Sequence, residues 1–215
     1  MFFPPSMYVL FVSFFTSLFL LKRPEAPFYL KLFPAFLLLT IIIELTGLYL
    51  VPHGFLTYKL YNFFTAFEFC FYLFIFSKMI RNTRVTRIIS YTIIAYLALA
   101  LINILFYQKN TFHSITYSLG CLLIVTCAVY YFLELFQSPT SIRLTKEPSF
   151  WITCGLLIYY CCTLPFMGLT GLLTTMPKVL LDNVYYVLIG TNIILYASFT
   201  IAFLCKIPVR KYILR

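Results

Sequence analysis

The chain has 215 residues, of which 62% are hydrophobic and only 10% are charged, and its formal net charge is +10. A soluble domain carries charge at about a quarter of its positions, so this composition excludes an ordinary water-soluble protein. Lipid must be the solvent for most of the chain. The positive charge is typical of membrane-flanking loops, and we expect no nucleic-acid partner.

Apolar runs occupy most of the chain, and each is about long enough to cross a hydrocarbon core of ~30 Å. There are seven of them, covering residues 3–21, 29–51, 56–79, 88–107, 112–136, 149–175 and 179–205. None alternates with the period of a strand, and helices satisfy their own backbone hydrogen bonds in lipid. The sequence therefore predicts an all-α fold, a single bundle of seven transmembrane helices over residues 1–215. Pro34 and Pro165 should kink or interrupt the second and sixth helices.

The basic residues alternate between the connections. If the N-terminus is outside, thirteen of the sixteen Lys and Arg residues fall on the cytoplasmic side, and only Lys59, Lys109 and Lys178 fall outside. This positive-inside asymmetry predicts a cytoplasmic C-terminus. The inner clusters would also bind the anionic headgroups of membrane lipid. The first run has its basic residues after it, the reverse of a secretory signal, so we expect it to remain as a helix.

The run at 56–79 contains a carboxylate, Glu68, within the segment YNFFTAFEFCFYLF. Its polar residues recur at helical spacing, so they share one face that should turn away from lipid. These residues are Tyr58, Tyr61, Thr65, Glu68 and Tyr72, with Asn62 on the flank.

Three other runs carry a comparable polar stripe. The positions are Thr40, Glu44 and Gly47; Thr92, Tyr96, Asn103 and Tyr107; and Asp182, Tyr185, Ile189, Asn192 and Tyr196, with Asn183 beside them. In the predicted topology these groups converge on the outer half of the bundle. We therefore predict an outward-facing pocket with its floor near Glu68. The candidate ligand-binding residues are Glu44, Tyr58, Tyr61, Asn62, Glu68, Asn103, Asp182, Tyr185 and Asn192.

Glu68 is the residue whose burial in the membrane most needs an explanation. A carboxylate at the bilayer centre costs about 2.5–3.5 kcal/mol on insertion, and no Lys or Arg lies within the apolar part of any run. Three explanations remain open. Protonated Glu68 could donate a hydrogen bond that joins neighbouring helices; Glu44, Glu68 and Asp182 could form a ligand or ion site; or the acids could relay protons.

Motifs for familiar chemistry are missing. The two histidines, His53 and His113, are expected at the outer rim and are too few for a zinc hydrolase. There is no lysine for retinal within the last run, no phosphate-binding loop and no HExxH. We predict no metal and no cofactor, and we favour a non-enzymatic function. Glu134, near the inner end of its run, is expected to pair with Arg143 or Lys146.

Three segments resemble a family of small multi-helix inner-membrane proteins of Bacteroidota. They are LYNFFTAFEFCFY (60–72), PSFWITCGLLIYY (148–160) and LIGTNIILYASFTIAFLCK (188–206). The resemblance covers the full length in order and implies a location in the bacterial inner membrane, but it says little about activity.

These patterns favour a sensor- or receptor-like module that binds a small ligand in the outward-facing pocket. Such a module would need a cytoplasmic or membrane protein partner to transmit the signal. The alternatives are a proton-coupled transporter using Glu44 and Glu68, a membrane-embedded lipid-modifying enzyme, and a purely structural subunit.

Overall fold

The computed structural model describes residues 3–137, 144–168 and 178–205, and it describes side chains there except at 167–168 and 178–184. No strand occurs in these ranges, so the all-α prediction is confirmed for them. The longer helices are α1 (Pro5–Leu21), α3 (Phe33–Leu50), α4 (Tyr58–Met79), α5 (Thr83–Ile102), α6 (Ser114–Phe136), α7 (Pro148–Gly168) and α9 (Lys178–Leu204). The short ones are α2 (Phe28–Lys31), η1 (Val51–His53), η2 (Asn103–Tyr107) and η3 (Leu144–Lys146).

Within the described ranges, six segments are long and apolar enough to cross a membrane. They are Phe28–His53, Tyr58–Met79, Thr83–Tyr107, Ser114–Phe136, Pro148–Phe166 and Tyr185–Leu204. The first predicted run forms α1, which is apolar but only 17 residues long. The prediction of seven spanning helices is thus confirmed by length and composition for six. The end of the predicted sixth run, 169–175, lies outside the described residues.

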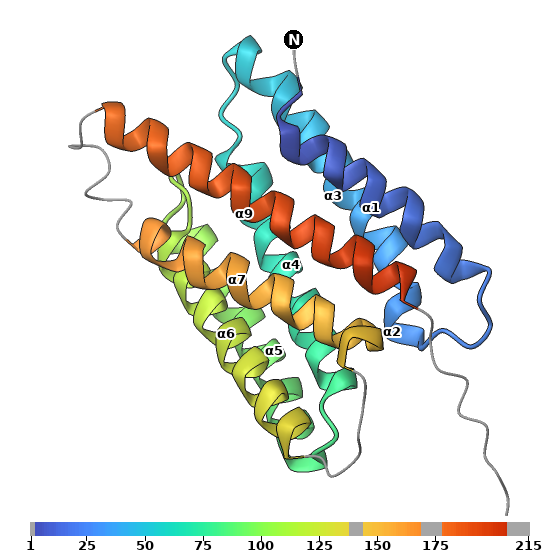
Figure 1. Cartoon of the computed structure of the whole chain (residues 1–215). Helices are drawn as coiled ribbons and strands as arrows, with labels where there is room; N and C mark the ends of the chain where they lie inside the picture. The colour runs from blue at the N-terminus through green and yellow to red at the C-terminus, as the bar shows by residue number, and fades with distance from the viewer. Residues whose placement is uncertain (1–2, 138–143, 169–177, 206–215) are drawn as a thin grey trace, which may run out of the picture.

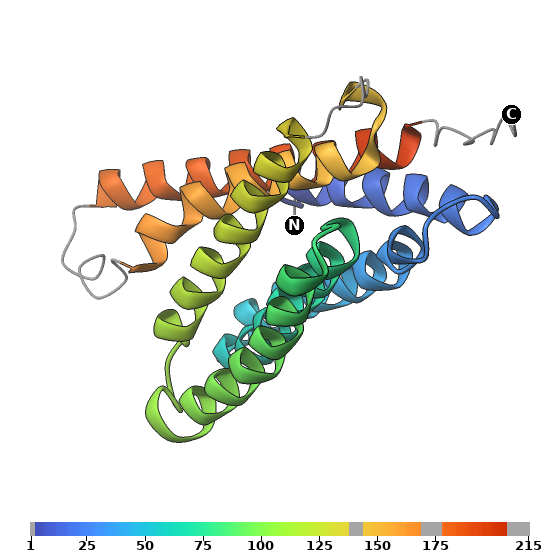
Figure 2. The same ribbon diagram turned by 90° about the horizontal axis from the view of Figure 1, so that it is seen from below.

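The long helices form two layers (Figures 1 and 2). Helices α1, α9 and α7 lie side by side in one layer, and α3, α4 and α5 form the other. Contacts between α1 and α3 join the layers along one edge, and α6, which packs on both α4 and α7, joins them along the other. Six helices, α1, α3, α4, α6, α7 and α9, therefore close a ring, and α5 packs against α4 from outside.

Pro34 interrupts the second predicted helix near its start. Helix α2 ends at Lys31 and α3 begins at Phe33, with the proline in the first turn of α3. In the first turn of a helix the backbone N–H groups have no acceptor within the helix, so a proline there costs no hydrogen bond. Its ring, however, prevents the preceding turn from continuing into α3. The interruption leaves α3 as an uninterrupted helix through the rest of its span.

Glycines bring α4 close to α6 and α7 close to α9. A Cβ built on Gly120 of α6 would lie 2.7 Å from ring atoms of Phe69, and one on Gly155 of α7 would lie 2.8 Å from Cβ of Ser198. Only a residue without a side chain allows these approaches. Both glycines therefore set the spacing of the ring of helices.

Aromatic side chains fill the ring at the end remote from the 51–57 connection. Phe36 stacks on Phe71 with centroids 4.1 Å apart, and Phe33 makes edge contacts with Phe71 and Phe199 at 5.4 and 5.3 Å. The first two contacts join α3 to α4 within one layer, and the contact of Phe33 with Phe199 of α9 bridges the two layers. Large apolar residues also cover the outside of the bundle, as expected for a surface that faces lipid; examples are Phe15, Phe28, Ile94 and Phe106.

Candidate ligand-binding cavity

A cavity of about 400 Å³ opens inside the ring of helices. Its walls come from α3, α4, α6, α7 and α9 and from the connections that precede α4 and α6. Most of its lining carries hydroxyl, carboxyl or amide groups. The lining residues are Thr40, Glu44, Thr57, Tyr58, Tyr61, Phe64, Thr65, Glu68, Phe112, Tyr117, Tyr159, Asn192 and Tyr196.

Glu44 and Tyr61 link α3 to α4 at the wall of this cavity. The Tyr61 hydroxyl donates a hydrogen bond to Glu44 Oε2 at 3.3 Å. Gly47 lies one turn after Glu44, and a Cβ there would collide with the Tyr61 hydroxyl. The absence of a side chain at Gly47 is therefore what allows the phenol to reach the carboxylate.

Glu68 lies deeper in the cavity. It comes ten residues after Tyr58, the first residue of α4, which is about 15 Å along the helix axis. That depth is half of a ~30 Å hydrocarbon core. The side chains of Tyr72 and Tyr160 lie beside the carboxyl group, and both residues are almost completely buried. The cavity thus extends from one end of the bundle to about its middle.

A smaller cavity of about 100 Å³ adjoins the first near the beginning of α1. The two share Glu44, Asn192 and Tyr196, and the smaller one is otherwise lined by Pro4, Ser6, Met7 and Leu10. Glu44 is therefore bordered by empty volume on two sides.

His113 is completely buried beside the cavity. Its Nε2 lies 2.6 Å from Thr65 Oγ1, and its Nδ1 lies 2.7 Å from Thr116 Oγ1. The Thr65 hydroxyl also donates to the Tyr61 carbonyl at 2.7 Å. Toward His113 the Thr65 hydroxyl oxygen can therefore act only as a hydrogen-bond acceptor, so the network assigns the neutral tautomer with hydrogen on Nε2. Burial lowers the pKa of His113 from 6.5 to about 4.

Asn62 and Asn103 extend the same network. Asn62 donates to the Thr111 carbonyl at 2.9 Å and accepts from the His113 backbone N–H at 3.1 Å. Asn103, at the start of the π-helical turn η2, donates to Gln108 Oε1 at 2.8 Å and Thr116 Oγ1 at 3.1 Å. These bonds attach the connection between α5 and α6 to the wall of the cavity.

The structure divides the nine candidate residues into four groups. Five of them line the cavity: Glu44, Tyr58, Tyr61, Glu68 and Asn192. Asn62 and Asn103 are buried in the His113 network, outside the lining. Tyr185 is 56% exposed and does not line the cavity, because its turn of α9 lies beyond the part that faces α4. Asp182 belongs to α9, and its side chain, like that of Asn183, lies outside the described residues.

Several residues were not anticipated as part of the cavity. Tyr117 and Tyr159 contribute rings from α6 and α7, and Phe112 and Thr57 contribute from connections. The available signal was weak, because the run 112–136 contains three tyrosines and the run 149–175 contains two, and nothing in the sequence marks which of them reach the cavity. His113 was expected at the rim; it directly precedes α6 and is buried there, with its ring nitrogens bonded to Thr65 and Thr116 and its backbone N–H donating to Asn62.

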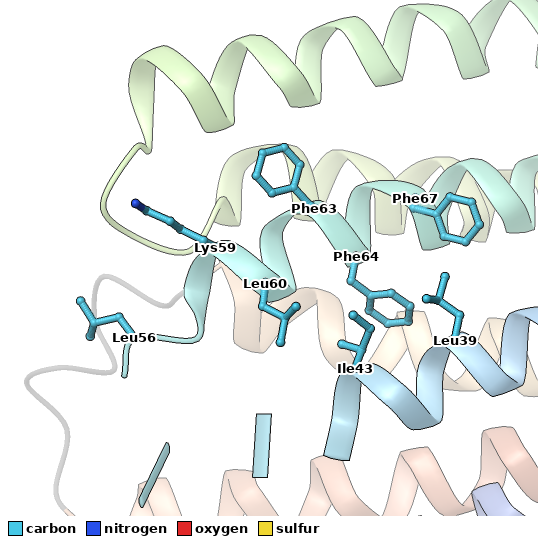
Figure 3. A pocket seen from close by; sticks show the side chains of 8 residues that line it. All are labelled: Leu39, Ile43, Leu56, Lys59, Leu60, Phe63, Phe64 and Phe67. Atoms are coloured by element: carbon cyan, nitrogen blue, oxygen red, sulfur yellow. The ribbon is translucent and has the colours of Figure 1, made fainter. Parts of the chain in front are cut away.

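An apolar groove of about 540 Å³ lies next to the cavity, between α3 and α4 (Figure 3). Phe64 belongs to both linings, and its ring points toward Leu39 and Ile43 of α3. Phe63 and Phe67, which also line the groove, are 49% and 47% exposed. Phe64 therefore separates the polar cavity from the outer surface of the bundle.

At the opposite end of the bundle, Glu134 has backbone partners. Glu134 accepts hydrogen bonds from the backbone N–H groups of Arg81 and Asn82 at 2.8 and 2.9 Å, just before α5 begins. It thus holds the turn between α4 and α5. The pairing of Glu134 with Arg143 or Lys146 stays a prediction, and Arg143 lies outside the described residues. Within the described part of the chain, no group of three or more His, Cys, Asp or Glu residues is placed to hold a metal ion.

Six helices suited to spanning a membrane, five of which line an internal polar cavity, define a multi-pass helical membrane protein. Comparison with protein-family models, with curated proteins and with solved structures finds no match to this chain. The cavity itself is therefore the basis for inferring a function.

Proposed function

We propose that this protein is a receptor-like module of the bacterial inner membrane that binds a small ligand in the cavity between its two helix layers. The main support for this proposal is the cavity of about 400 Å³ that runs from one end of the bundle to Glu68. Ligand pockets in proteins measure about 300–1,000 Å³. The positive-inside distribution of Lys and Arg orients the mouth of the cavity to the outside.

The chemistry of the lining supports a binding role. A purely structural use of Glu44 and Glu68 would place each carboxyl group against a helix partner in a filled interior. Glu44 does have a helix partner in Tyr61, but both carboxyl groups also border empty volume together with Asn192. Polar groups that converge on a preformed concave site are typical of ligand recognition.

The packing below Glu68 favours a receptor over a carrier. Tyr72, one turn further along α4, is 1% exposed, and its ring lies 6.1 Å from that of Tyr160 and 6.2 Å from that of Phe199. This layer closes the inner end of the cavity. Access from one side is what a sensor requires, whereas a carrier must open both ends in turn.

The position of the cavity suggests how binding could be transmitted. A ligand between Tyr61 of α4 and Asn192 of α9 would touch both helix layers at once. Binding would shift these layers relative to each other, and the loops at the inner end would pass that shift to a cytoplasmic or membrane protein partner.

The experiment is a thiol-accessibility test in intact membranes. Thr40 lines the cavity and bonds back to the Phe36 carbonyl at 3.0 Å, whereas Thr126 makes the same bond to Leu122 at 2.7 Å on the outer surface of α6. We expect a membrane-impermeant thiol reagent added from outside to label Thr40→Cys above the wild-type background and to leave Thr126→Cys unlabelled. Equal labelling of the two variants would contradict the proposal.

A lipid-modifying enzyme is the second candidate, supported by the groove that shares Phe64 with the cavity. An acyl chain in the groove would place a lipid headgroup near Glu44 and Glu68, which could act as general acid and base. A proton-coupled transporter would use the same acids. It predicts that Thr40→Cys is labelled from both sides of the membrane, whereas a receptor predicts labelling from outside only.

A further inference from the structure

We propose that the ligand of this cavity is an organic cation, an ammonium group carried on an apolar body. The inference rests on the proposed function and names the chemical class that the site would take. It is carried by two carboxyl groups and a set of aromatic rings that border one cavity, in which the described lining includes no basic side chain.

Apart from the tyrosines, the ionisable side chains of the described lining are two carboxyl groups. Glu44 and Glu68 come from different helices, α3 and α4, and both reach the cavity. Lys59 lines the neighbouring apolar groove, where its amine points away from Ile43 and Leu39 (Figure 3). His113 has both ring nitrogens engaged by threonine hydroxyls. An anionic ligand would meet two carboxyl groups with no compensating charge.

The aromatic lining suits a cation with organic substituents. Rings of Tyr61, Tyr117, Tyr159 and Tyr196 come from four different helices and border the same volume. The face of an aromatic ring attracts a cation within about 6 Å, and recognition of ammonium groups by several rings uses this attraction. Tyrosine hydroxyls add hydrogen-bond acceptors for any N–H group.

The size of the cavity and its donor set argue against a bare metal ion. Calcium and magnesium are held by six or more oxygen atoms in a closed shell of about 2.0–2.6 Å. Here the carboxyl groups border about 400 Å³ of open volume, and no metal-holding group of acidic, His or Cys residues occurs in the described residues. An organic body is what would fill the remaining space.

The test measures protection of Thr40→Cys from the impermeant thiol reagent by defined probes. The probes are tetramethylammonium, choline and benzyltrimethylammonium, and the matched control is dimethylbutanol, the uncharged isostere of choline in which carbon replaces nitrogen. We expect at least one cation to slow labelling in a saturable manner and the uncharged isostere to have no effect at the same concentration. The same cation should raise the thermal stability of the detergent-purified wild-type chain.

Two variants and a control connect the effect to the carboxyl groups. Glu44→Gln and Glu68→Gln should each raise the half-protecting cation concentration by about tenfold, since removal of one charge–charge or charge–ring contact changes affinity on this scale. Glu25→Gln makes the same change at an exposed position between α1 and α2 and should leave it unchanged. If Glu68→Gln does not fold, the same measurement is made on Glu44→Gln and Tyr61→Leu.

The outcomes separate the two proposals. If Thr40→Cys is labelled but no cation protects it, or if dimethylbutanol protects as well as choline does, the cation inference is overturned and the outward-facing pocket stands. If Thr40→Cys is not labelled at all, the pocket itself is overturned. Equal protection in Glu44→Gln, Glu68→Gln and wild type would also reject the cation inference.

Discussion

The Tyr61 hydroxyl reaches Glu44 Oε2 across the boundary between α3 and α4, at 3.3 Å, over the bare backbone of Gly47. This relationship joins two of the polar groups that border the cavity. The hydrogen bond also depends on Gly47, which has no side chain. A substitution at Gly47 can therefore perturb the bond while leaving both Tyr61 and Glu44 in place.

Gly47→Ala should displace the Tyr61 ring and break its hydrogen bond to Glu44. The new methyl group would collide with the phenol, and the tyrosine must turn into the cavity to relieve this. We expect reduced labelling of Thr40→Cys in this background and a loss of about 1–3 kcal/mol in the free energy of unfolding. The measurements are labelling rates in membranes and denaturant titration in detergent.

Gly190→Ala is the control for this change. Gly190 lies in α9, and a Cβ there meets nothing within 4 Å among the described atoms. Both substitutions gain about 1 kcal/mol of helix propensity, so the difference between them isolates the collision. A Gly47→Ala chain that labels and unfolds like Gly190→Ala would refute the role given to Gly47.

The burial of neutral His113 predicts a stability that falls on acidification. Its pKa is about 4 in the folded chain and 6.5 ordinarily, so the unfolded chain binds the proton first as pH falls. The contribution of His113 to the free energy of unfolding is complete above pH 6.5 and is lost as the pH falls toward 4. The loss should reach up to about 3 kcal/mol.

His113→Gln is the comparison, because glutamine does not titrate. The variant should be less stable at neutral pH, since the hydrogen bonds to Thr65 and Thr116 change. Its stability should nevertheless depend less steeply on pH between 4 and 6.5. Parallel stability curves for wild type and variant would show that His113 does not titrate on unfolding.

The close approach of α6 to α4 predicts that Gly120→Ala is destabilising. The added carbon would lie 2.7 Å from the Phe69 ring, and Phe69 is wedged between Tyr96, Tyr117 and Tyr160. Overpacking of this kind costs about 1–3 kcal/mol. Gly190→Ala again serves as the reference in thermal unfolding, and a Gly120→Ala chain of equal or greater stability would contradict the packing described.

The turn between α4 and α5 should depend on Glu134. Its two oxygens accept from the backbone N–H groups of Arg81 and Asn82 at 2.8 and 2.9 Å. Glu134→Ala should lower the free energy of unfolding by about 1–3 kcal/mol, because two backbone donors lose a charged acceptor. Glu25→Ala, at an exposed position, should have little effect. Equal losses for both would mean that overall charge, rather than this turn, matters.

The sequence alone determined the all-α fold class, because lipid imposes it. Long apolar runs in a bilayer must become helices, although the limits were less exact: α5 begins at Thr83, before the predicted start at residue 88. The inward direction of Thr65 and Glu68 followed from helical spacing, since a polar stripe avoids lipid. Five of nine candidate residues, found on this basis, border one cavity.

Only the tertiary structure decided which polar residues meet. Asn103 and Tyr185 carry the same type of signal as Glu44 and Tyr58, yet one joins the His113 network and the other faces outward. Periodicity reports the face of a helix but not the neighbour that covers it. That neighbour depends on contacts between distant segments, such as Gly120 against Phe69 and Gly47 against Tyr61. In both contacts an aromatic ring occupies the space beside a glycine, and the periodicity of the sequence does not predict which ring that is.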